Sequence, residues 1–341
     1  MVDVTVEIST KDRYDFLAQA IQSIALQTVA PKKLIITDDG RFLDLRQSPL
    51  FSCLFKVLDR KGIQWEVLKG EGRGQVINHQ RVLEKAKTEF IFRLDDDNVL
   101  GHNVLERLTK LFEDPKVGAA ASCVLHPGRE FPPEVTSSSI KDCLFKYAVQ
   151  FSQFEGIKEV EHLYSTFMYR KSAAQSYPMY LSAVGHREET IFTHQIFRDG
   201  YKLLVDGEAS TWHFQAPQGG IRTFNNPHLW AEDDKKFKRQ LDQWNIRTNR
   251  WKLIHLNNGI GDHYMLRSVF ERIKTRNPNT LFIIAACYPD VFWDFKEGQV
   301  TSITGGEILS NGDVSKYDVY KFCYENNWEK HLSDAFLKMY G

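Results

Sequence analysis

The sequence lacks any long hydrophobic run, and it lacks an excess of charge of either sign. No apolar stretch approaches the roughly 18 residues that a membrane-spanning helix needs. Lysine and arginine together number 44, as do aspartate and glutamate, so the formal net charge is zero. This balance gives no overall attraction to nucleic acid or to an anionic membrane, although it is compatible with a local basic patch. The chain begins directly with a predicted strand, without the pattern of a secretory signal peptide.

Cysteine is scarce, and its spacing argues against cysteine-based sites. The five cysteines are scattered, and no two of them form a CxxC pair: Cys53, Cys123, Cys143, Cys287 and Cys323. An odd number without paired spacing is typical of free thiols in a reducing compartment. With 42% hydrophobic residues, the 341-residue chain is instead expected to fold around a sizeable core, in about two domains.

A short apolar run, residues 90–94, ends in three consecutive carboxylates, Asp95, Asp96 and Asp97. Three like charges in a row repel one another, so they need a cation or solvent. Oxygen ligands at the end of a strand suit Mg²⁺ or Mn²⁺, and such ions usually also hold substrate phosphates. A solvated turn is the alternative interpretation for an isolated triplet.

The N-terminal region predicts a strand, a helix and a second strand. Residues 2–8 alternate apolar and polar, residues 16–24 have apolar positions at helical spacing, and residues 33–37 form the second strand, which ends in Asp38-Asp39-Gly40. Polar groups at the carboxyl end of each strand are typical of a nucleotide-binding crevice in an open α/β sheet.

These pieces resemble the family 2 glycosyltransferases, which are inverting enzymes of the GT-A fold. The resemblance covers roughly residues 2–215, and its order and spacing both agree. The matching segments are Ser9-Thr10, Arg13, Gln27-Thr28, Asp38-Asp39-Gly40, Gly74 to Asn78, and residues 87–97. The resemblance implies an α/β nucleotide-diphospho-sugar transferase domain with a sugar-nucleotide donor and a divalent metal. Because many relatives carry membrane helices and this chain has none, we expect a soluble, cytoplasmic enzyme.

The resemblance also implies a metal site. Asp97 is expected to bind Mn²⁺ or Mg²⁺, and Asp95 to reach the ribose or donor sugar, with a second possible role as a metal ligand. Asp96 is assigned to the donor site, although it is free to point away. The segment 203–214 resembles the closing strand of the family, which often ends in histidine, so His213 is expected as a further ligand. Neutral imidazole binds Mn²⁺ better than Mg²⁺.

The nucleotide is expected to bind at the ends of the first two strands. A carboxylate of the Asp38-Asp39 pair would accept the uracil N3–H, which favours a UDP-sugar, although a plain Asp-Gly turn is the alternative. Thr10 would line the base and Arg13 would face a phosphate. Residues 74–78 resemble the family segment that approaches the diphosphate, which makes Arg73 and Asn78 candidates for donor binding.

The catalytic base is expected downstream, where Glu188 and Glu189 open a helical pattern. Relatives place an acidic pair here, and the second acid removes the acceptor proton. This assigns Glu189 as the base and Glu188 as an acceptor or donor contact. Relatives have aspartate at the second position, so the side chain here is one methylene longer. Acids at a helix start are also favoured without any catalytic role.

The remaining sequence divides into two parts. Residues 225–251 are charged and helical, which predicts a solvated connector, with contact to an anionic acceptor as the alternative. Residues 252–341 predict a small Rossmann-like α/β appendage: a strand, a glycine loop at 257–262, a helix and a strand. This part is similar to the start of a heptosyltransferase-like GT-B domain, in which the loop acid, here Asp262, can sit in the active site.

We therefore interpret the chain as a metal-dependent inverting glycosyltransferase, with residues 1–224 as the GT-A domain. A saccharide is the expected acceptor, and a hydroxymethylated DNA base is the alternative. A sugar-phosphate nucleotidyltransferase is a rival, but it should have a glycine-rich basic loop after the first strand, where this chain has Ser-Thr-Lys-Asp-Arg. A second rival is a non-catalytic glycan-binding or sugar-nucleotide-binding module. The carboxylates present at both the expected metal site and the expected base position argue against it. The sequence indicates neither the donor sugar nor an oligomeric state.

Overall fold

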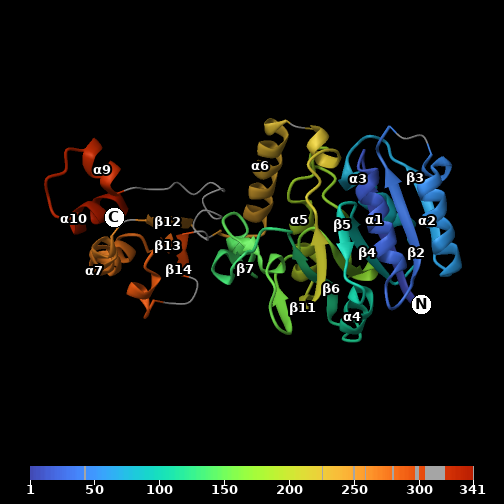
Figure 1. Ribbon diagram of the computed structural model, residues 1–341, viewed down its shortest axis with the longest axis horizontal. Coiled ribbons are helices and arrows are strands. Elements are labelled where there is room, and N and C mark those ends of the chain that lie inside the picture. The colour runs from blue at the N-terminus through green and yellow to red at the C-terminus, as the bar shows by residue number, and fades with distance from the viewer. Residues whose placement is uncertain are drawn as a thin grey trace. The chain divides into compact units, whose positions relative to one another are not determined.

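The computed structural model describes residues 1–41, 44–224, 226–248, 250–257, 259–278, 280–295, 299–303 and 319–340. The chain forms two compact units, and each is described by itself. The first unit comprises residues 1–130 and 150–246, and the second comprises residues 131–149 and 247–341. The predicted α/β class is confirmed, and Figure 1 shows the elements of both units.

A mixed sheet forms the centre of the first unit, with the strand order β3-β2-β1-β4-β10-β6-β11-β5 and with β9 paired to β11. Strands β1, β2, β3 and β4 are parallel, whereas β10 runs antiparallel to β4. The strands are β1 (Val2–Thr10), β2 (Pro31–Asp38), β3 (Gln64–Lys69), β4 (Phe90–Asp95), β5 (Asn98–Leu100), β6 (Val117–Leu125), β9 (Ile157–Val160), β10 (Phe167–Arg170) and β11 (Lys202–His213).

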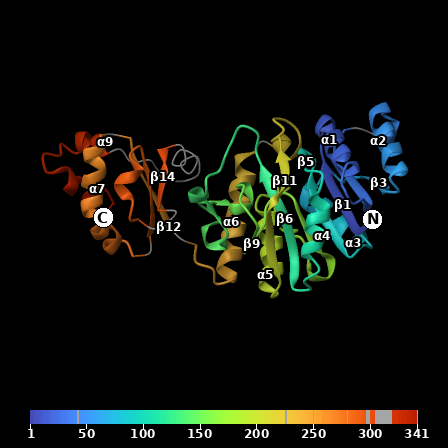
Figure 2. The same cartoon turned by 60° about the horizontal axis from the view of Figure 1, so that its bottom comes forward.

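Helices pack on both faces of this sheet (Figure 2). The helices of the unit are α1 (Tyr14–Ala25), α2 (Pro49–Arg60), α3 (Gln75–Lys85), α4 (Val104–Leu111), α5 (Glu188–Arg198) and α6 (Pro227–Gln243). The main core lies where α1, α2 and α4 meet one face of β1, β2 and β4. Leu17 and Ile21 of α1 are completely buried there, and each such side chain contributes about 1.5–3 kcal/mol.

The register of the parallel strands brings their carboxyl ends together. Ser9 of β1 pairs with Asp95 of β4, and Thr10 pairs with Asp38 of β2. Because parallel strands all end at the same edge, segments that are far apart in the sequence meet there. This edge therefore holds the polar residues that the sequence analysis assigned to the donor.

Helix α6 contains most of the segment that the sequence predicted as a solvated connector. One side of the helix is buried, since Asp233, Phe237 and Leu241 are each at most 2% exposed. Most of its charged residues are exposed, as the 3.6-residue period of an amphipathic helix requires. The helix is part of the first unit.

The second unit contains a parallel three-stranded sheet in the order β12-β13-β14. The strands are β12 (Arg250–Leu256), β13 (Thr280–Ala286) and β14 (Val300–Ser302), and the helices are α7 (Ile260–Arg276), α9 (Val319–Glu325) and α10 (Leu332–Tyr340). Asp262 lies in the first turn of α7, where both carboxylate oxygens accept hydrogen bonds from the Tyr320 hydroxyl. Asn258, in the predicted glycine loop, lies outside the described residues.

Two short strands, β7 (Thr136–Ser137) and β8 (Tyr147–Ala148), also belong to the second unit. They come from residues 131–149, which the sequence analysis had assigned to the first domain. Within the described ranges, no helix combines the length and the apolar character needed to cross a membrane.

Gly74 precedes α3, and its backbone passes close to the backbone of Ala183. Its φ is +94°, and a Cβ there would lie 2.2 Å from the carbonyl oxygen of Ala183. Gly200 has a similar φ of +92°, but a Cβ there would meet nothing within 4 Å. We expect Gly200→Ala to cost about 1 kcal/mol through backbone strain alone. Gly74→Ala should cost clearly more, because the backbone at Ala183 must also move.

Thermal unfolding of the two variants measures this difference. Equal melting temperatures for Gly74→Ala and Gly200→Ala would contradict the close approach of the two segments.

Candidate active site

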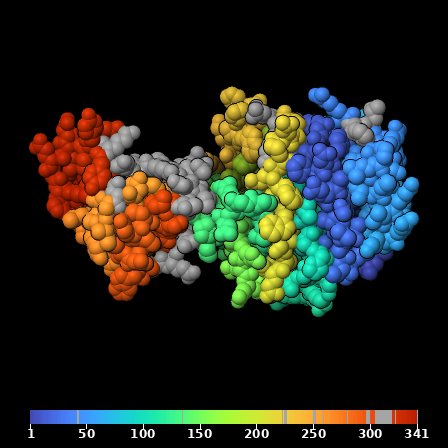
Figure 3. All heavy atoms as spheres, viewed as in Figure 1, coloured from blue at the N-terminus to red at the C-terminus, as the bar shows by residue number. Residues whose placement is uncertain are grey.

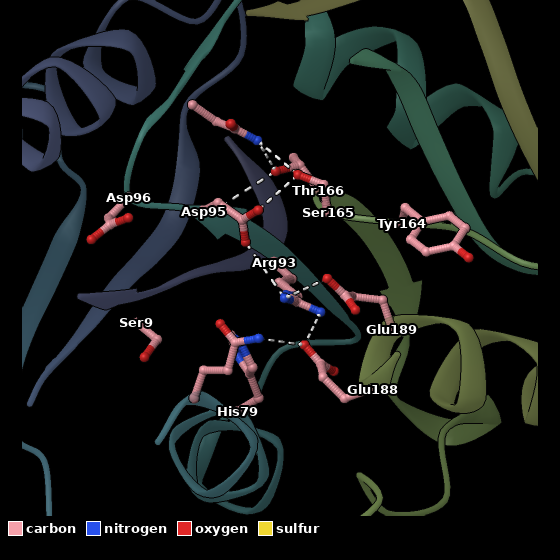
Figure 4. Close-up of polar contacts among 12 residues, drawn as sticks. Ser9, His79, Arg93, Asp95, Asp96, Tyr164, Ser165, Thr166, Glu188 and Glu189 are labelled. Carbon is pink, nitrogen blue, oxygen red and sulfur yellow. Dashed lines mark hydrogen bonds and ion pairs between the residues drawn. The ribbon is translucent and has the colours of Figure 1, made fainter. Parts of the chain in front are cut away.

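Asp95 ends β4 and points toward the interior of the site. Its Oδ2 accepts a hydrogen bond of 2.7 Å from the Ser165 hydroxyl, and its Oδ1 lies 3.5 Å from Nη2 of Arg93. Asp96 is turned away from this group (Figure 4). Asp95 therefore faces other partners than Asp96 does, which reduces the repulsion between the two.

Asp96 and Asp97 share one cation, the guanidinium of Arg13. Nη1 of Arg13 lies 3.0 Å from Asp96 and 3.3 Å from Asp97, and all three side chains are at least nine-tenths buried. The Thr10 hydroxyl donates a further hydrogen bond of 2.8 Å to Asp96. Burial raises the pKa of Asp96 above its ordinary value, and the charge of Arg13 opposes this effect. Some of the positive charge expected near the three carboxylates is thus supplied by Arg13.

The segment 214–220, which follows β11, covers this carboxylate pair. The Ala216 N–H donates to Oδ2 of Asp97 at 2.8 Å, and the Gly220 N–H donates to the Lys11 carbonyl at 2.7 Å. Nε of Arg13 donates to the Gln218 carbonyl at 3.0 Å. Figure 3 shows these yellow residues against the blue residues of the N-terminal segment. The segment leaves Asp97 only 2% exposed.

His213, the last residue of β11, completes the surroundings of Asp97. Its Nε2 lies 3.3 Å from Oδ1 of Asp97, and its side chain is 18% exposed. Burial alone would raise the pKa of Asp97, but the hydrogen bond from His213, the charge of Arg13 and the Ala216 N–H lower it to about 2. Asp97 is therefore a carboxylate, the form that binds a metal.

The spacing of Asp97 and His213 matches that of two ligands of a divalent ion. Two neighbouring ligands of an octahedral ion lie about 3 Å apart when each bond is about 2.1 Å, and Oδ1 of Asp97 and Nε2 of His213 are separated by 3.3 Å. Within the described part of the chain, no group of three or more His, Cys, Asp or Glu side chains is arranged to hold a metal. The separation within the pair is thus that of two neighbouring ligands of one divalent ion.

The predicted nucleotide residues lie around the ends of β1 and β2. Asp38 accepts hydrogen bonds from the Gly40 N–H and the Tyr14 hydroxyl, and burial raises its pKa. The carboxylate of Asp39 accepts from the Gly72 and Gly74 N–H groups at 3.0 and 3.2 Å. The two segments that the sequence assigned to the donor are thus in direct contact.

The two remaining donor candidates differ in burial. The Asn78 amide is buried and donates to the Ser9 hydroxyl at 2.9 Å. The Arg73 side chain is 62% exposed and pairs with Glu71 at 3.4 Å. Arg73 is therefore free to reorient toward a ligand at little cost, whereas Asn78 is fixed.

Glu188 and Glu189 begin α5, and their environments differ. Glu188 is completely buried, with Oε1 2.6 Å from Nη1 of Arg93, and burial raises its pKa well above the ordinary value although Arg93 opposes this. The Glu189 side chain is 17% exposed, and its Oε1 lies 3.5 Å from Nη2 of Arg93. Only Glu189 of the two is accessible to a bound molecule.

Sequence reasoning assigned no role to Arg93. The residue lies in the middle of β4, is 1% exposed, and contacts Asp95, Glu188 and Glu189 together (Figure 4). Burial by itself would lower its pKa, but the three carboxylates outweigh this and raise it, so it stays charged. The signal was a single arginine within an otherwise apolar strand, since a buried cation requires carboxylate partners.

Asp233 of α6 is a second residue without a sequence-based role. Its carboxylate accepts hydrogen bonds from the Ser182 N–H and hydroxyl, both at 2.7 Å, and from the His186 N–H at 3.0 Å. It thereby fixes the loop that leads into α5. This loop contains a sharp backbone turn, with φ of +65° at Gly185 and +73° at Arg187.

Comparison with known proteins identifies the family. The model of glycosyl transferase family 2 matches residues 5–177, which is half of the chain. The chain belongs to glycosyl transferase family 2. It is a glycosyltransferase, and the prediction of a GT-A fold is confirmed. The matched region includes Asp95, Asp96 and Asp97 but ends before Glu188, Glu189 and His213. The roles of all six residues stay predictions.

Solved structures are similar to this chain only at a low level. S. aureus TarS is 18% identical over 64% of this chain and 37% of its own, with a TM-score of 0.46. GalNAc-T7, in a structure with UDP, GalNAc and Mn²⁺, is 13% identical over 63% of this chain and 44% of its own, with a TM-score of 0.48. The mannosyltransferase PcManGT from Pyrobaculum calidifontis, in complex with GDP-Man and Mn²⁺, is 15% identical over 63% of this chain and 58% of its own, with a TM-score of 0.45.

The chain thus spans less than two thirds of the length of each of these three proteins, and likenesses at this level say nothing about its own substrate. A search of curated proteins found no match. The predicted similarity of residues 252–341 to a heptosyltransferase-like domain is unconfirmed, since the family match ends at residue 177.

The anchoring of the loop before α5 can be tested with two neighbouring acids. We expect Asp233→Ala to lower the free energy of unfolding by about 1–3 kcal/mol, because it leaves three partly buried donors without their carboxylate partner. Asp234→Ala is the matched control, since Asp234 is 38% exposed and its ion pairs with His186 and Arg187 are both long, at 3.4 Å. Urea unfolding of both variants measures the difference, and equal midpoints would contradict the anchoring role.

Proposed function

We propose that this glycosyltransferase moves a sugar from a UDP-sugar to a hydroxyl of a saccharide acceptor, with inversion at the anomeric carbon. The observation that carries the proposal is the position of Glu189. Its carboxylate is accessible and lies beside Arg93, which also contacts Asp95 at the donor edge. The carboxylate proposed as the base for the acceptor and the carboxylate proposed to contact the donor thus both contact Arg93.

Donor binding is assigned to the carboxyl edge of β1, β2 and β4. A carboxylate of the Asp38-Asp39 pair would accept the uracil N3–H, and Asp95 would contact the ribose or the donor sugar. The exposed guanidinium of Arg73 would supply charge to the diphosphate. The contact between Asp39 and the Gly72–Gly74 backbone supports a single site for base and phosphates.

A divalent ion, Mn²⁺ or Mg²⁺, is assigned to Asp97 and His213. When bound, such an ion acts as a Lewis acid that stabilises the negative charge of the leaving diphosphate. The low pKa of Asp97 keeps its carboxylate charged. Arg13 holds the second oxygen of Asp97, which leaves Oδ1 directed toward His213.

In the proposed reaction, Glu189 accepts the proton of the acceptor hydroxyl as the oxygen attacks the anomeric carbon. The new glycosidic bond forms on the face opposite the diphosphate, the bond from the anomeric carbon to the diphosphate oxygen breaks, and UDP leaves with that electron pair. Glu188 is unsuited to this step because it is completely buried and paired with Arg93. A base must come within hydrogen-bond distance of the acceptor.

The donor and the metal are tested together by thermal shift. We expect UDP to raise the melting temperature in the presence of Mn²⁺. At a hundredfold excess over its Kd, a ligand that binds only the folded state adds about 2.7 kcal/mol to the free energy of unfolding. Asp97→Asn should remove the Mn²⁺-dependent part of this shift. Asp114→Asn, which alters an ion pair with Lys202, is the control and should leave it unchanged. A response to GDP or CDP with none to UDP would overturn the uracil assignment, and full turnover in EDTA would overturn the metal.

The base is tested with paired substitutions and a panel of UDP-glucose, UDP-galactose and their N-acetylated forms. We expect Glu189→Gln to bind UDP normally and to lose about 10²–10⁴-fold in the rate of sugar transfer to water or a saccharide. Glu188→Gln should retain more activity, and Glu208→Gln, at an exposed surface position, should retain all of it. The reverse order of the first two variants would make Glu188 the base, and normal rates in both would exclude this mechanism.

A further inference from the structure

One buried guanidinium meets three carboxylates at the proposed catalytic centre. Nη1 of Arg93 lies 2.6 Å from Glu188, whereas Nη2 lies 3.5 Å from Glu189 and also 3.5 Å from Asp95. Figure 4 shows Arg93 between Asp95 on one side and the two glutamates on the other. The same nitrogen therefore touches the proposed base and the acid assigned to the donor.

The burial of Arg93 argues against a purely stabilising role. Arg93 is 1% exposed and packs against the ring of Phe167, with 5.6 Å between the guanidinium carbon and the ring centroid. Removing a guanidinium and its carboxylate partners from water costs several kcal/mol for each ion. Apolar residues of similar size often give equal or greater stability in such positions. Stability alone therefore does not account for an arginine here.

The shape of the side chain suggests what it does. A guanidinium is planar, and its two terminal nitrogens hold a fixed separation and direction, unlike the single mobile nitrogen of lysine. Glu189 and Asp95 are both partly buried, so their carboxylates would otherwise repel each other. Nη2 between them offsets this repulsion and fixes their separation. The strand supplies the guanidinium, and the packing around Phe167 limits its movement.

We propose that Arg93 is a positioning residue, which holds Glu189 beside Asp95 so that the acceptor hydroxyl and the donor sugar meet in line. This proposal rests on the proposed function, because it assigns Glu189 to the acceptor and Asp95 to the donor. Glu188 has a supporting part: it occupies Nη1 and so leaves Nη2 directed at the two functional acids. A displacement of about 1 Å in a reacting group can cost about 10²-fold in rate.

A double-mutant cycle tests whether Arg93 acts through Glu189. We expect Arg93→Lys to keep UDP affinity and the KM for the UDP-sugar within about threefold of the unsubstituted protein, while kcat falls about 10²-fold. In the Glu189→Gln background, the same change should cost less than about threefold, because residues that act as a unit are not additive. Full additivity of the two losses would overturn the proposal, as would a loss of UDP binding in Arg93→Lys.

The matched control is Arg170 of β10, which lies at the opposite end of β4. Its side chain is 14% exposed, pairs with Glu89, and lies over the rings of Phe90 and Phe112. Arg170→Lys replaces an arginine of the same sheet but leaves Asp95, Glu188 and Glu189 unchanged. It should lower the melting temperature without changing kcat. An equal loss of kcat in both lysine variants would mean that Arg93 has only a structural role.

A crystal structure of Arg93→Lys tests the placement without any activity measurement. We expect the Glu189 carboxylate to move by more than about 1 Å relative to Asp95, with the backbone of β4 and α5 unchanged. An unmoved Glu189 would overturn the proposal. Absence of turnover by the unsubstituted protein on every UDP-sugar would instead count against the proposed function, while the crystal structure still decides the role of Arg93.

Discussion

Like charges a few ångströms apart repel strongly where water is excluded, and this constraint governs the site. Two buried guanidinium groups, those of Arg13 and Arg93, are distributed among five carboxylates near the carboxyl end of β4: Asp95, Asp96, Asp97, Glu188 and Glu189. The acids outnumber these cations, and burial raises the pKa of Asp96 and of Glu188, which limits the negative charge that the site carries. Asp97 keeps its charge, since its pKa is lowered to about 2, and the proposed divalent ion would bind between it and His213.

The fold satisfies this constraint by bringing distant segments to one edge. The parallel register of β1, β2 and β4 places Thr10, Asp38 and Asp95 at neighbouring strand ends. The acids of α5 are brought in from the other side by a loop that Asp233 of α6 fixes. A helix outside the sheet thus contributes to the geometry of the site through three hydrogen bonds, without a side chain of its own at the centre.

The parts that could be predicted from the sequence are those fixed by local pattern. The alternation in residues 2–8 predicts the first strand, and the acids after residue 94 mark the end of another. Because parallel strands end at the same edge, these two patterns also predict that their ends lie together. The pairing of Arg93 with Glu189 spans 96 positions, so it depends on how α5 packs against β4, which no local pattern encodes. The role of Asp233 could not be predicted for the same reason. In the sequence of a charged helix, nothing distinguishes the buried acid from its exposed neighbours. The assignment of residues 131–149 to the second unit likewise depends on tertiary contacts alone.

Adjacent acids at a helix start acquire different tasks because successive residues in a helix point about 100° apart. Glu188 therefore faces the interior, where it is 0% exposed and pairs with Nη1 of Arg93, while Glu189 faces the opening of the site. Both carboxylates are favoured by the helix N-terminus, but only the first bears the full cost of burial. That cost is offset by Arg93, whose other nitrogen then remains for Glu189 and Asp95. In the proposed mechanism, the buried Glu188 orients the guanidinium and the guanidinium orients Glu189, so that the first acid has a structural role and the second a chemical role.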